Sequence, residues 1–423
     1  MEDLLHYAWK HKILPLKGLC TQDGRPVEIL DTGLHNRNAG PDFFNAKIRI
    51  GDTLWVGNVE IHLRSSDWNK HGHQHDPAYD SVVLHVASCL DAEVTDCHGR
   101  RVPQMLIPYP DKLKSMYDEL LRRDFYPPCY AVLGTLSKLM IHSWMTALQY
   151  ERLEQKRLQI MERLALCDHN WEDAFFVTLA RNFGFGLNSD VFERWGRAVP
   201  LRALDKHRDS LFQIEALFFG QAGLLEETVN NGYFERLQRE YHYLAHKFSL
   251  KRMEPALWSF LRTRPGNFPH VRIAQMAWLF YEERSLLSRL LEAPDTDAVR
   301  HILSAKTSDY WQAHYYFGQV SPWRTKSLSS STQDLLLINT VSPFLYAYGH
   351  YRQDERLMMR ALSFLEELKP ENNYIIRQWR QCGLPIENAA DTQALIQLKK
   401  MYCDVRKCLY CRFGYEYLRR KES

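Results

Sequence analysis

Long uninterrupted apolar runs are missing from this 423-residue chain, although 45% of its residues are hydrophobic. Charged residues interrupt every apolar run well before the ~18 residues that a membrane-spanning helix needs. The first residues, MEDLLHYAWKHKILPLKG, lack the basic region, apolar core and cleavage site of a secretory signal. We therefore expect a soluble, cytoplasmic protein with no membrane partner.

A strong excess of one charge is also missing, because 54 basic and 51 acidic residues give a net charge of only +3. No overall basic field marks the chain as a nucleic-acid-binding protein, and only a local basic groove remains open. The nine cysteines are an odd number and spread unevenly, which excludes a secreted disulfide scaffold. Scattered cysteines typically behave as small buried hydrophobic residues. The scattered cysteines of this chain are Cys20, Cys89, Cys97, Cys129 and Cys167.

The apolar pattern changes near residue 113, which predicts two domains, 1–112 and 113–423. The first domain begins with a helical pattern at residues 2–11. Gly51-Asp52 predicts a hairpin turn between its second and third strands. Ser65, Ser66 and Asp67 predict a short helix or turn over residues 66–80. The expected strands are residues 26–32, 43–50, 53–63 and 81–88, followed by a hairpin at 93–94 and 102–106.

The order of these elements is α, β, β, β, α, β, which predicts a mixed sheet. From residue 113 the periodicity is helical almost to the end, with its longest run at residues 139–166. The chain should therefore be an α+β protein, with a mixed-sheet domain followed by a large all-α domain.

Two carboxylates stand at strand ends that the predicted hairpin brings together. Asp42 begins the second strand and Glu60 lies near the end of the third, so both can reach one cation. Because strand side chains alternate, Glu60, His62 and Arg64 share one face. Lys47 on the neighbouring strand is a second candidate for a positive charge.

A dense group of histidines follows in the segment HGHQHD. His71 and His75 are four residues apart and would share the face of a helix. The segment is either a solvated polar helix, a transition-metal site, or a set of partners for the Glu60 site. The candidate metal ligands in it are His71, His73, His75 and Asp76.

Two further segments are candidates for contact with nucleic-acid phosphates. The loop before Asp42 contains Asn36, Arg37 and Asn38, residue types that also form turns without any function. The second segment precedes a helix, where guanidinium groups and backbone N–H groups can bind phosphate or brace the helix. Its candidates are Arg264, Asn267 and Arg272.

Three cysteines lie close together near the end of the chain, at Cys403, Cys408 and Cys411. Zinc and iron–sulfur sites use thiolates at such intervals, and both need a fourth ligand. Cys382 is the nearest candidate in sequence. The alternative is that the three thiols pack in the core from one face of a terminal helix.

The order of Pro41, Asp42 and Glu60 resembles the PD-(D/E)XK nuclease superfamily, which has a restriction-endonuclease-like αβββαβ core. The resemblance covers about the first 110 residues and implies that Asp42 and Glu60 bind magnesium or manganese. His62 stands where these nucleases have a lysine that positions the attacking water. An imidazole is a poorer permanent cation, so this departure concerns catalysis more than fold.

Several longer motifs, among them GPDFFNAKI, WVGNVEIHLRSSDW and YCDVRKCLYCRFG, resemble an uncharacterised bacterial family catalogued as a domain of unknown function. This resemblance spans the chain and implies no activity. Three functions therefore remain open. They are a metal-dependent nuclease, an inactive nuclease-like module that binds nucleic acid or protein, and a hydrolase with zinc held by histidines.

Overall fold

The computed structural model describes residues 2–13, 18–36, 38–122, 126–227 and 229–420. The chain divides into two compact units, of which the first joins Met1–Lys138 to Lys399–Ser423 and the second is Leu139–Leu398. Strands give way to helices near the boundary predicted at residue 113. The compact first unit nevertheless extends beyond it and includes the end of the chain.

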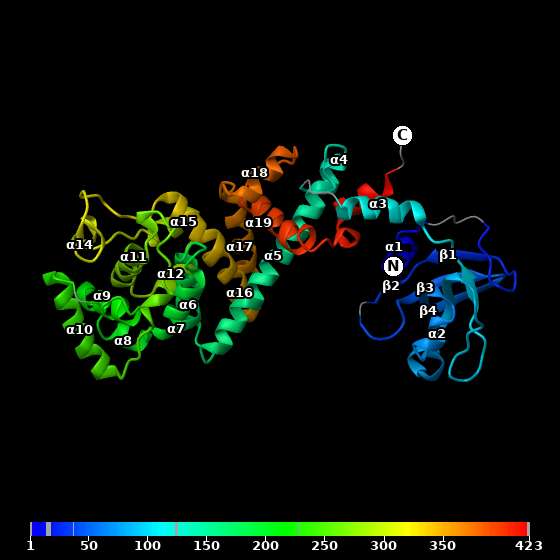
Figure 1. Ribbon diagram of the computed structural model, residues 1–423, viewed down its shortest axis with the longest axis horizontal. Helices are drawn as coiled ribbons and strands as arrows, with labels where there is room; N and C mark the ends of the chain where they lie inside the picture. Colours follow the sequence, from blue (N-terminus) through cyan, green and yellow to red (C-terminus); the bar gives the residue numbers. More distant parts are fainter. Residues whose placement is uncertain (1, 14–17, 37, 123–125, 228, 421–423) are drawn as a thin grey trace. The chain divides into compact units, whose positions relative to one another are not determined.

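The first unit contains the larger sheet and the helices around it (Figure 1). Its helices are α1 (Glu2–Lys10), α2 (Asp67–Lys70), α3 (Asp111–Arg122), α4 (Tyr130–Leu133) and α20 (Arg412–Arg419). Its strands are β1 (Val27–Asp31), β2 (Leu34–His35), β3 (Phe43–Ile50), β4 (Thr53–Arg64), β5 (Val82–Cys89) and β6 (Gln104–Leu106). Short helical turns are η1 (His73–His75), η2 (Pro77–Tyr79), η6 (Lys399–Cys403) and η7 (Cys408–Tyr410).

The sheet has the order β1-β3-β4-β5-β6, and β2 pairs with β3. The pairs β1–β3 and β3–β4 are antiparallel, whereas β4–β5 and β5–β6 are parallel. The turn at Gly51-Asp52 joins β3 to β4, where Ile50 pairs with Thr53. The predicted α+β class with a mixed sheet and the predicted hairpin at Gly51-Asp52 are therefore confirmed, whereas the second predicted hairpin, at 93–94 and 102–106, contains within this fully described segment only the isolated bridge between Thr95 and Arg101.

One face of the sheet packs against α1 to form an apolar core. Along β4, Val59 and Ile61 point into this core and are fully buried, as alternation predicts. Trp9 of α1 is also buried there, and its indole N–H donates to the carbonyl of Thr32. The opposite face of β4 therefore carries Glu60 and His62.

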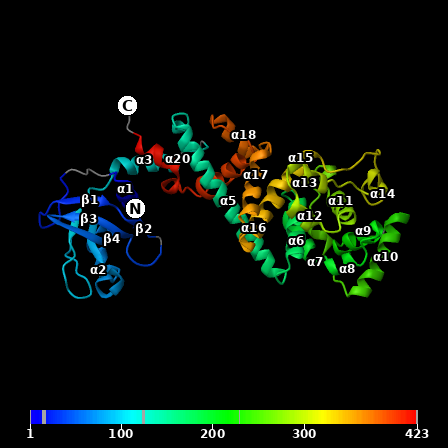
Figure 2. The same cartoon turned by 180° about the vertical axis from the view of Figure 1, so that it is seen from behind.

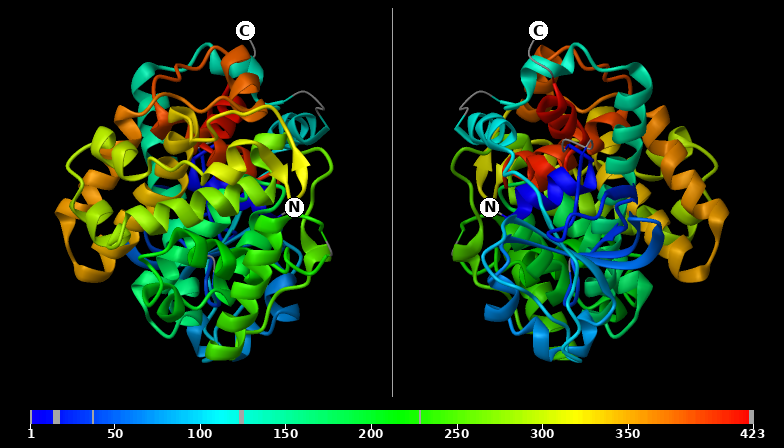
Figure 3. Two further views of the ribbon diagram at one scale, coloured as in Figure 1. Left: turned by 90° about the vertical axis from the view of Figure 1, so that its left-hand side faces the viewer. Right: turned by 90° about the vertical axis from the view of Figure 1, so that its right-hand side faces the viewer.

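The end of the chain returns to the first unit. Helix α20 packs against α3 and α4, and Figures 2 and 3 show it beside α3 and α1. Tyr415 of α20 meets the rings of Tyr7 and His11, and the hydroxyl of Tyr417 donates to Glu119 of α3. The unit is therefore built from two segments far apart in sequence.

The second unit is mainly helical and has its own apolar core. Its first helices are α5 (Lys138–Leu166), α6 (Trp171–Phe183), α7 (Ser189–Ala198), α8 (Leu201–Asp205), α9 (Leu211–Gln221) and α10 (Gly232–Phe248). Next come η3 (Pro255–Leu257), η4 (Pro265–Asn267), α11 (Pro269–Glu282), α12 (Leu286–Glu292), α13 (Thr296–Ile302) and α14 (Asp309–Gln312). Its last helices are α15 (Ser330–Leu336), η5 (Leu337–Val341), α16 (Ser342–Arg352), α17 (Glu355–Glu367), α18 (Tyr374–Gln381) and α19 (Ala389–Leu398).

A small antiparallel hairpin interrupts the helices of this unit, so the prediction of an all-α domain was wrong in this detail. It pairs β7 (His314–Tyr316) with β8 (Gln319–Val320). Aromatic residues favour strands, and Gly318 takes a positive φ of 73° in the turn. Among the described helices of the chain, none combines the length and the apolar character needed to cross a bilayer.

Candidate metal centre

The two predicted carboxylates meet where β3 begins. Phe43 pairs with Val59, which sets Asp42 beside Glu60 on the neighbouring strand. The backbone N–H of Asp42 donates to Glu60 Oε2 at 3.0 Å, and the N–H of Ile61 donates to Asp42 Oδ2 at 2.9 Å. The strand register thus fixes both carboxylates, as the hairpin predicts.

Two histidines approach Glu60, and a third approaches one of these two. Glu60 Oε1 lies 3.3 Å from His73 Nε2 and 3.5 Å from His62 Nε2. His62 Nε2 lies 3.2 Å from His71 Nδ1. One nitrogen from each of His62, His71 and His73 falls within 4.8 Å of the others. The carboxylates and the histidines therefore form one cluster.

The segment between β4 and β5 turns rather than forming one continuous helix. Helix α2 ends at Lys70, and Gly72, with a positive φ of 77°, leads the chain into η1. As a result, His73 is buried and the exposed His71 still reaches His62, whereas the exposed His75 and Asp76 lie outside this group. The side chain of Asp76 caps η2 by accepting from the N–H of Ala78. The predicted pairing of His71 with His75 on one helical face was wrong.

Aromatic side chains cover the histidines. The ring of His73 stacks on Tyr79, with 3.8 Å between centroids, and meets Trp68 edge to face. Trp68 is fully buried, and its indole N–H donates to the carbonyl of Thr95. Glu60 and His62 are consequently only 5% and 2% exposed. The cluster is a sheltered site with His71 at its exposed side.

Burial governs the charges of the cluster. It raises the pKa of Glu60, the nearby charge of Asp42 adds to the rise, and the hydrogen bond from His73 opposes it. Burial also lowers the pKa of His62 to about 3, helped by the surrounding imidazoles. His62 is therefore a neutral imidazole near pH 7. Such a ring is a good metal ligand and a poor substitute for a charged lysine.

Two further histidines hold the cluster in place. His85 on β5 lies behind His62, with its Nε2 2.9 Å from His62 Nδ1. His6 of α1 lies 3.2 Å from Asp42 Oδ2, through its Nε2. Burial alone would lower the pKa of His6, but its hydrogen bond to Asp42 and the charge of that carboxylate raise it. We missed His6 because no local spacing connects α1 with β3.

The two predicted positive charges lie outside the cluster. Lys47 pairs with Val56, four residues before Glu60, which corresponds to roughly 13 Å along a strand. Arg64 shares the face of Glu60, but it is exposed and its guanidinium lies 3.8 Å from Asp91. Neither residue therefore replaces the lysine of the nuclease pattern at Glu60.

The loop before Asp42 is held by its own hydrogen bonds. The side-chain amide of Asn36 donates to the carbonyls of Asn38, Ala39 and Pro41, and its oxygen accepts from the N–H of Asn38. Asn36 thus shapes the approach to Asp42. Asn38 is exposed, and Arg37 lies outside the described residues.

Arg272 is a brace inside the second unit. It is 6% exposed, its guanidinium donates to Gln275 Oε1 and Asn267 Oδ1, and it lies over the ring of Phe185. We therefore leave Arg272 out of any nucleic-acid surface. Arg264 is exposed beside η4, as is Asn267.

The C-terminal cysteines belong to the first unit, whereas Cys382 belongs to the second. The thiol of Cys382 donates to the carbonyl of Gln378, and burial raises its pKa. Cys382 thus lies in a different compact unit from the three cysteines that it was predicted to join, and no contact among the described residues of either unit supports it as the fourth ligand.

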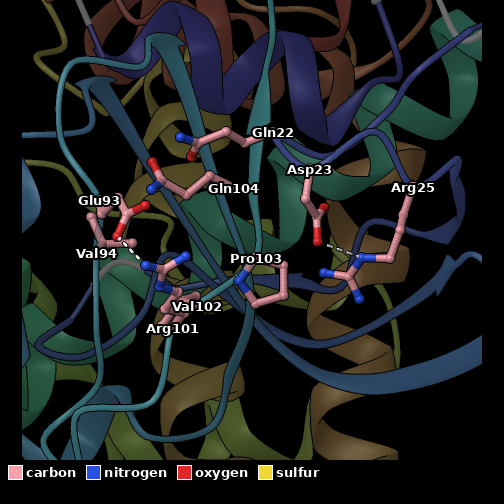
Figure 4. A pocket seen from close by; sticks show the side chains of 9 residues that line it. All are labelled: Gln22, Asp23, Arg25, Glu93, Val94, Arg101, Val102, Pro103 and Gln104. Carbon is pink, nitrogen blue, oxygen red and sulfur yellow. Dashed lines mark hydrogen bonds and ion pairs between the residues drawn. The ribbon is translucent and has the colours of Figure 1, made fainter.

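Two other polar features lie in the first unit. Asp80, Cys97 and His98 form a surface group in which Asp80 Oδ2 accepts from the thiol at 3.0 Å and lies 3.2 Å from the imidazole. A hollow of about 250 Å³ lies beside β6, where Asp23 pairs with Arg25 and Glu93 with Arg101 (Figure 4). Its charges neutralise one another, so the histidine cluster remains the stronger candidate site.

Comparison with known proteins identifies the family. The family model described as "Protein of unknown function (DUF2851)" matches residues 2–374, which is most of the chain. The chain belongs to this family. The predicted resemblance to a family of unknown function is thereby confirmed. A search of curated proteins gave no match. A search of solved structures gave none either.

Proposed function

We propose that the first unit is a metal-dependent phosphodiesterase that acts on nucleic acid. Its divalent cation would be bound by Glu60 with His62, His73 and His71, next to Asp42. The single observation that carries the proposal is the approach of two imidazole nitrogens to Glu60 Oε1, at 3.3 and 3.5 Å.

The spacing of the donor atoms suits one cation. Ligands about 2.1 Å from a tetrahedral metal ion lie roughly 3.4 Å apart, close to the separations around Glu60 Oε1 and between His62 and His71. Imidazoles combined with a carboxylate favour borderline cations such as manganese or zinc over magnesium. The proposed ligand set therefore favours manganese or zinc as the cation.

The neighbouring residues complete the arrangement. If His62 Nδ1 donates to His85 Nε2, His62 Nε2 keeps the lone pair that a metal needs. Asp42, held by His6 and by the N–H of Ile61, stands at the edge of the cluster. Asp42 can there accept a proton from an attacking water or add a ligand. The bound cation would lower the pKa of that water and neutralise charge on the phosphate.

The order of elements supports a phosphodiester substrate. Apart from the two-residue strand β2 and the short turns η1 and η2, the chain passes through α1, β1, β3, β4, α2 and β5 in this order, and β5 runs parallel to β4. This order is compatible with the αβββαβ core that the nuclease resemblance implies, in which Asp42 and Glu60 would be the metal-binding acids. His62 still departs from that pattern, and in the proposal it acts as a ligand rather than as the lysine's equivalent.

Cleavage assays with defined metals test the proposal. The full chain is incubated with single- and double-stranded DNA and RNA in the presence of manganese, zinc or magnesium. We expect cleavage with manganese or zinc, and Glu60→Gln should reduce it by more than the roughly 10- to 100-fold that the loss of an outer-shell partner of a metal ligand costs. The conservative amide keeps the shape of the buried side chain.

His73→Ala and His75→Ala form a matched pair. Both residues lie in η1, but only His73 reaches Glu60. We expect the first variant to lose cleavage and the second to keep it, with circular dichroism confirming that both are folded. A chain that binds DNA in a salt-dependent manner but cleaves nothing with any of the three metals would contradict the proposal. That result would favour an inactive binding module.

A further inference from the structure

The C-terminal cysteines are arranged by two successive turns. Cys403 ends η6, and its carbonyl accepts from the N–H of Arg406, which takes a positive φ of 55°. This turn leads directly to Cys408 at the start of η7. The N–H of Cys411 then donates to the carbonyl of Cys408, and α20 begins at the next residue. The three cysteines therefore do not lie on one terminal helix.

The packing between η7 and α20 leaves little room for movement. A Cβ added to Gly414 would lie 2.2 Å from the carbonyl oxygen of Cys408, far closer than two such atoms approach. This contact fixes Cys408 relative to the start of α20. Cys411 stands at that start and is only 7% exposed.

A fourth cysteine comes from a distant part of the chain. Cys129 immediately precedes α4, and α4 packs against α20. Cys129 is 7% exposed. Burial raises the pKa of its thiol, and the charges of Cys411, Cys403 and Cys408 raise it further. Because Cys129 precedes α4 and Cys411 precedes α20, the packing of α4 on α20 brings Cys129, a scattered thiol by its place in the sequence, to the part of the first unit that holds the C-terminal cysteines.

We propose that Cys129, Cys403, Cys408 and Cys411 together bind one thiophilic metal centre, either a zinc ion or an iron–sulfur cluster. Four thiolates are the usual ligand set for both. All nine cysteines lie within the described residues, and none of them forms a disulfide bond.

The position of the centre explains what it would do. The first unit is interrupted by the whole of Leu139–Leu398, after which the chain must return to it. A metal that links Cys129 to the C-terminal cysteines closes this long loop, and closing a long loop stabilises the folded state. The centre therefore acts as a structural clamp, and it is separate from the cluster around Glu60.

Metal analysis of the full chain, purified with and without oxygen, tests the inference. About one zinc per chain at the thiols, or about four irons with broad absorption near 400 nm, would identify the centre. Cys129→Ala and Cys403→Ala should each lose this metal, whereas Cys382→Ala should keep it. Glu60→Gln should also keep it, which separates this centre from the proposed catalytic cation.

A second measurement uses the wild-type chain and therefore does not depend on whether the variants fold. Alkylation of the native wild-type chain, read by mass spectrometry, should show the four thiols protected and then labelled together when a chelator is added. Exposed Cys20 should label throughout. The inference is overturned if neither purification yields metal at these thiols after zinc addition or iron–sulfur reconstitution. It is also overturned if Cys129→Ala retains the metal that Cys403→Ala loses.

Discussion

A buried carboxyl group in the second unit should make stability fall as the pH rises. Glu215 on α9 is 1% exposed and accepts hydrogen bonds from the hydroxyls of Tyr233 and Ser308. Burial raises its pKa from 4.5 to about 7, although both hydrogen bonds oppose the rise. Between these two values the folded chain holds a proton on Glu215 that the unfolded chain has already released.

The sign follows from proton binding. Because the folded state binds more protons in this interval, the free energy of unfolding falls by about 1.4 kcal/mol per pH unit. From pH 4.5 to about 7, the loss amounts to roughly 3 kcal/mol. Glu215→Gln removes this titration and keeps the size of the side chain. The variant should therefore gain stability relative to the wild type as the pH rises.

Urea unfolding is measured at several pH values between 5 and 8 and is monitored by hydrogen exchange in peptides of α9. This gives the difference in the free energy of unfolding between each variant and the wild type. Glu226→Gln is the control, because the hydrogen bond from Arg252 lowers the pKa of Glu226, so that it stays ionised throughout the interval. We expect a difference that grows with pH for the Glu215 variant and a constant one for the control. A constant difference for Glu215→Gln would refute the reasoning.

Two substitutions test the packing around the candidate site. Gly57→Ala would place a Cβ 2.3 Å from Val83 Cγ1. We therefore expect the free energy of unfolding of the first unit, measured by urea titration, to drop by about 1–3 kcal/mol. An unchanged midpoint would show that β4 and β5 can move apart without cost. Trp68→Phe removes the indole bond to Thr95 and leaves a small cavity, for which we expect a loss of about 1–3 kcal/mol. It should also weaken metal binding, and unaltered affinity would mean that Trp68 does not hold His73 in place.

The sequence predicts the carboxylate pair well because strand pairing is a local property. A two-residue turn sets the register of β3 and β4, and that register alone brings Asp42 beside Glu60. The same alternation places His62 on the face of Glu60. Lys47 failed as a neighbour because periodicity gives the face of a strand, whereas the position along the strand depends on the register.

Tertiary contacts account for what the sequence could not predict. His6 reaches Asp42 from α1, and α4, which follows Cys129, packs against α20, which comes only after an entire inserted unit. Spacing rules work only between residues that share one element. The turn at Gly72 is an intermediate case, because a glycine between histidines is a visible signal that the helix has ended.

An anomalous difference map from crystals grown with manganese or zinc would show whether Glu60, His62 and His73 bind a cation. We expect a peak about 2.1 Å from the carboxylate of Glu60 and from the imidazoles of His62 and His73. The peak should disappear in crystals of Glu60→Gln. Ordered side chains around Glu60 without any peak, at saturating metal, would show that these residues bind no cation.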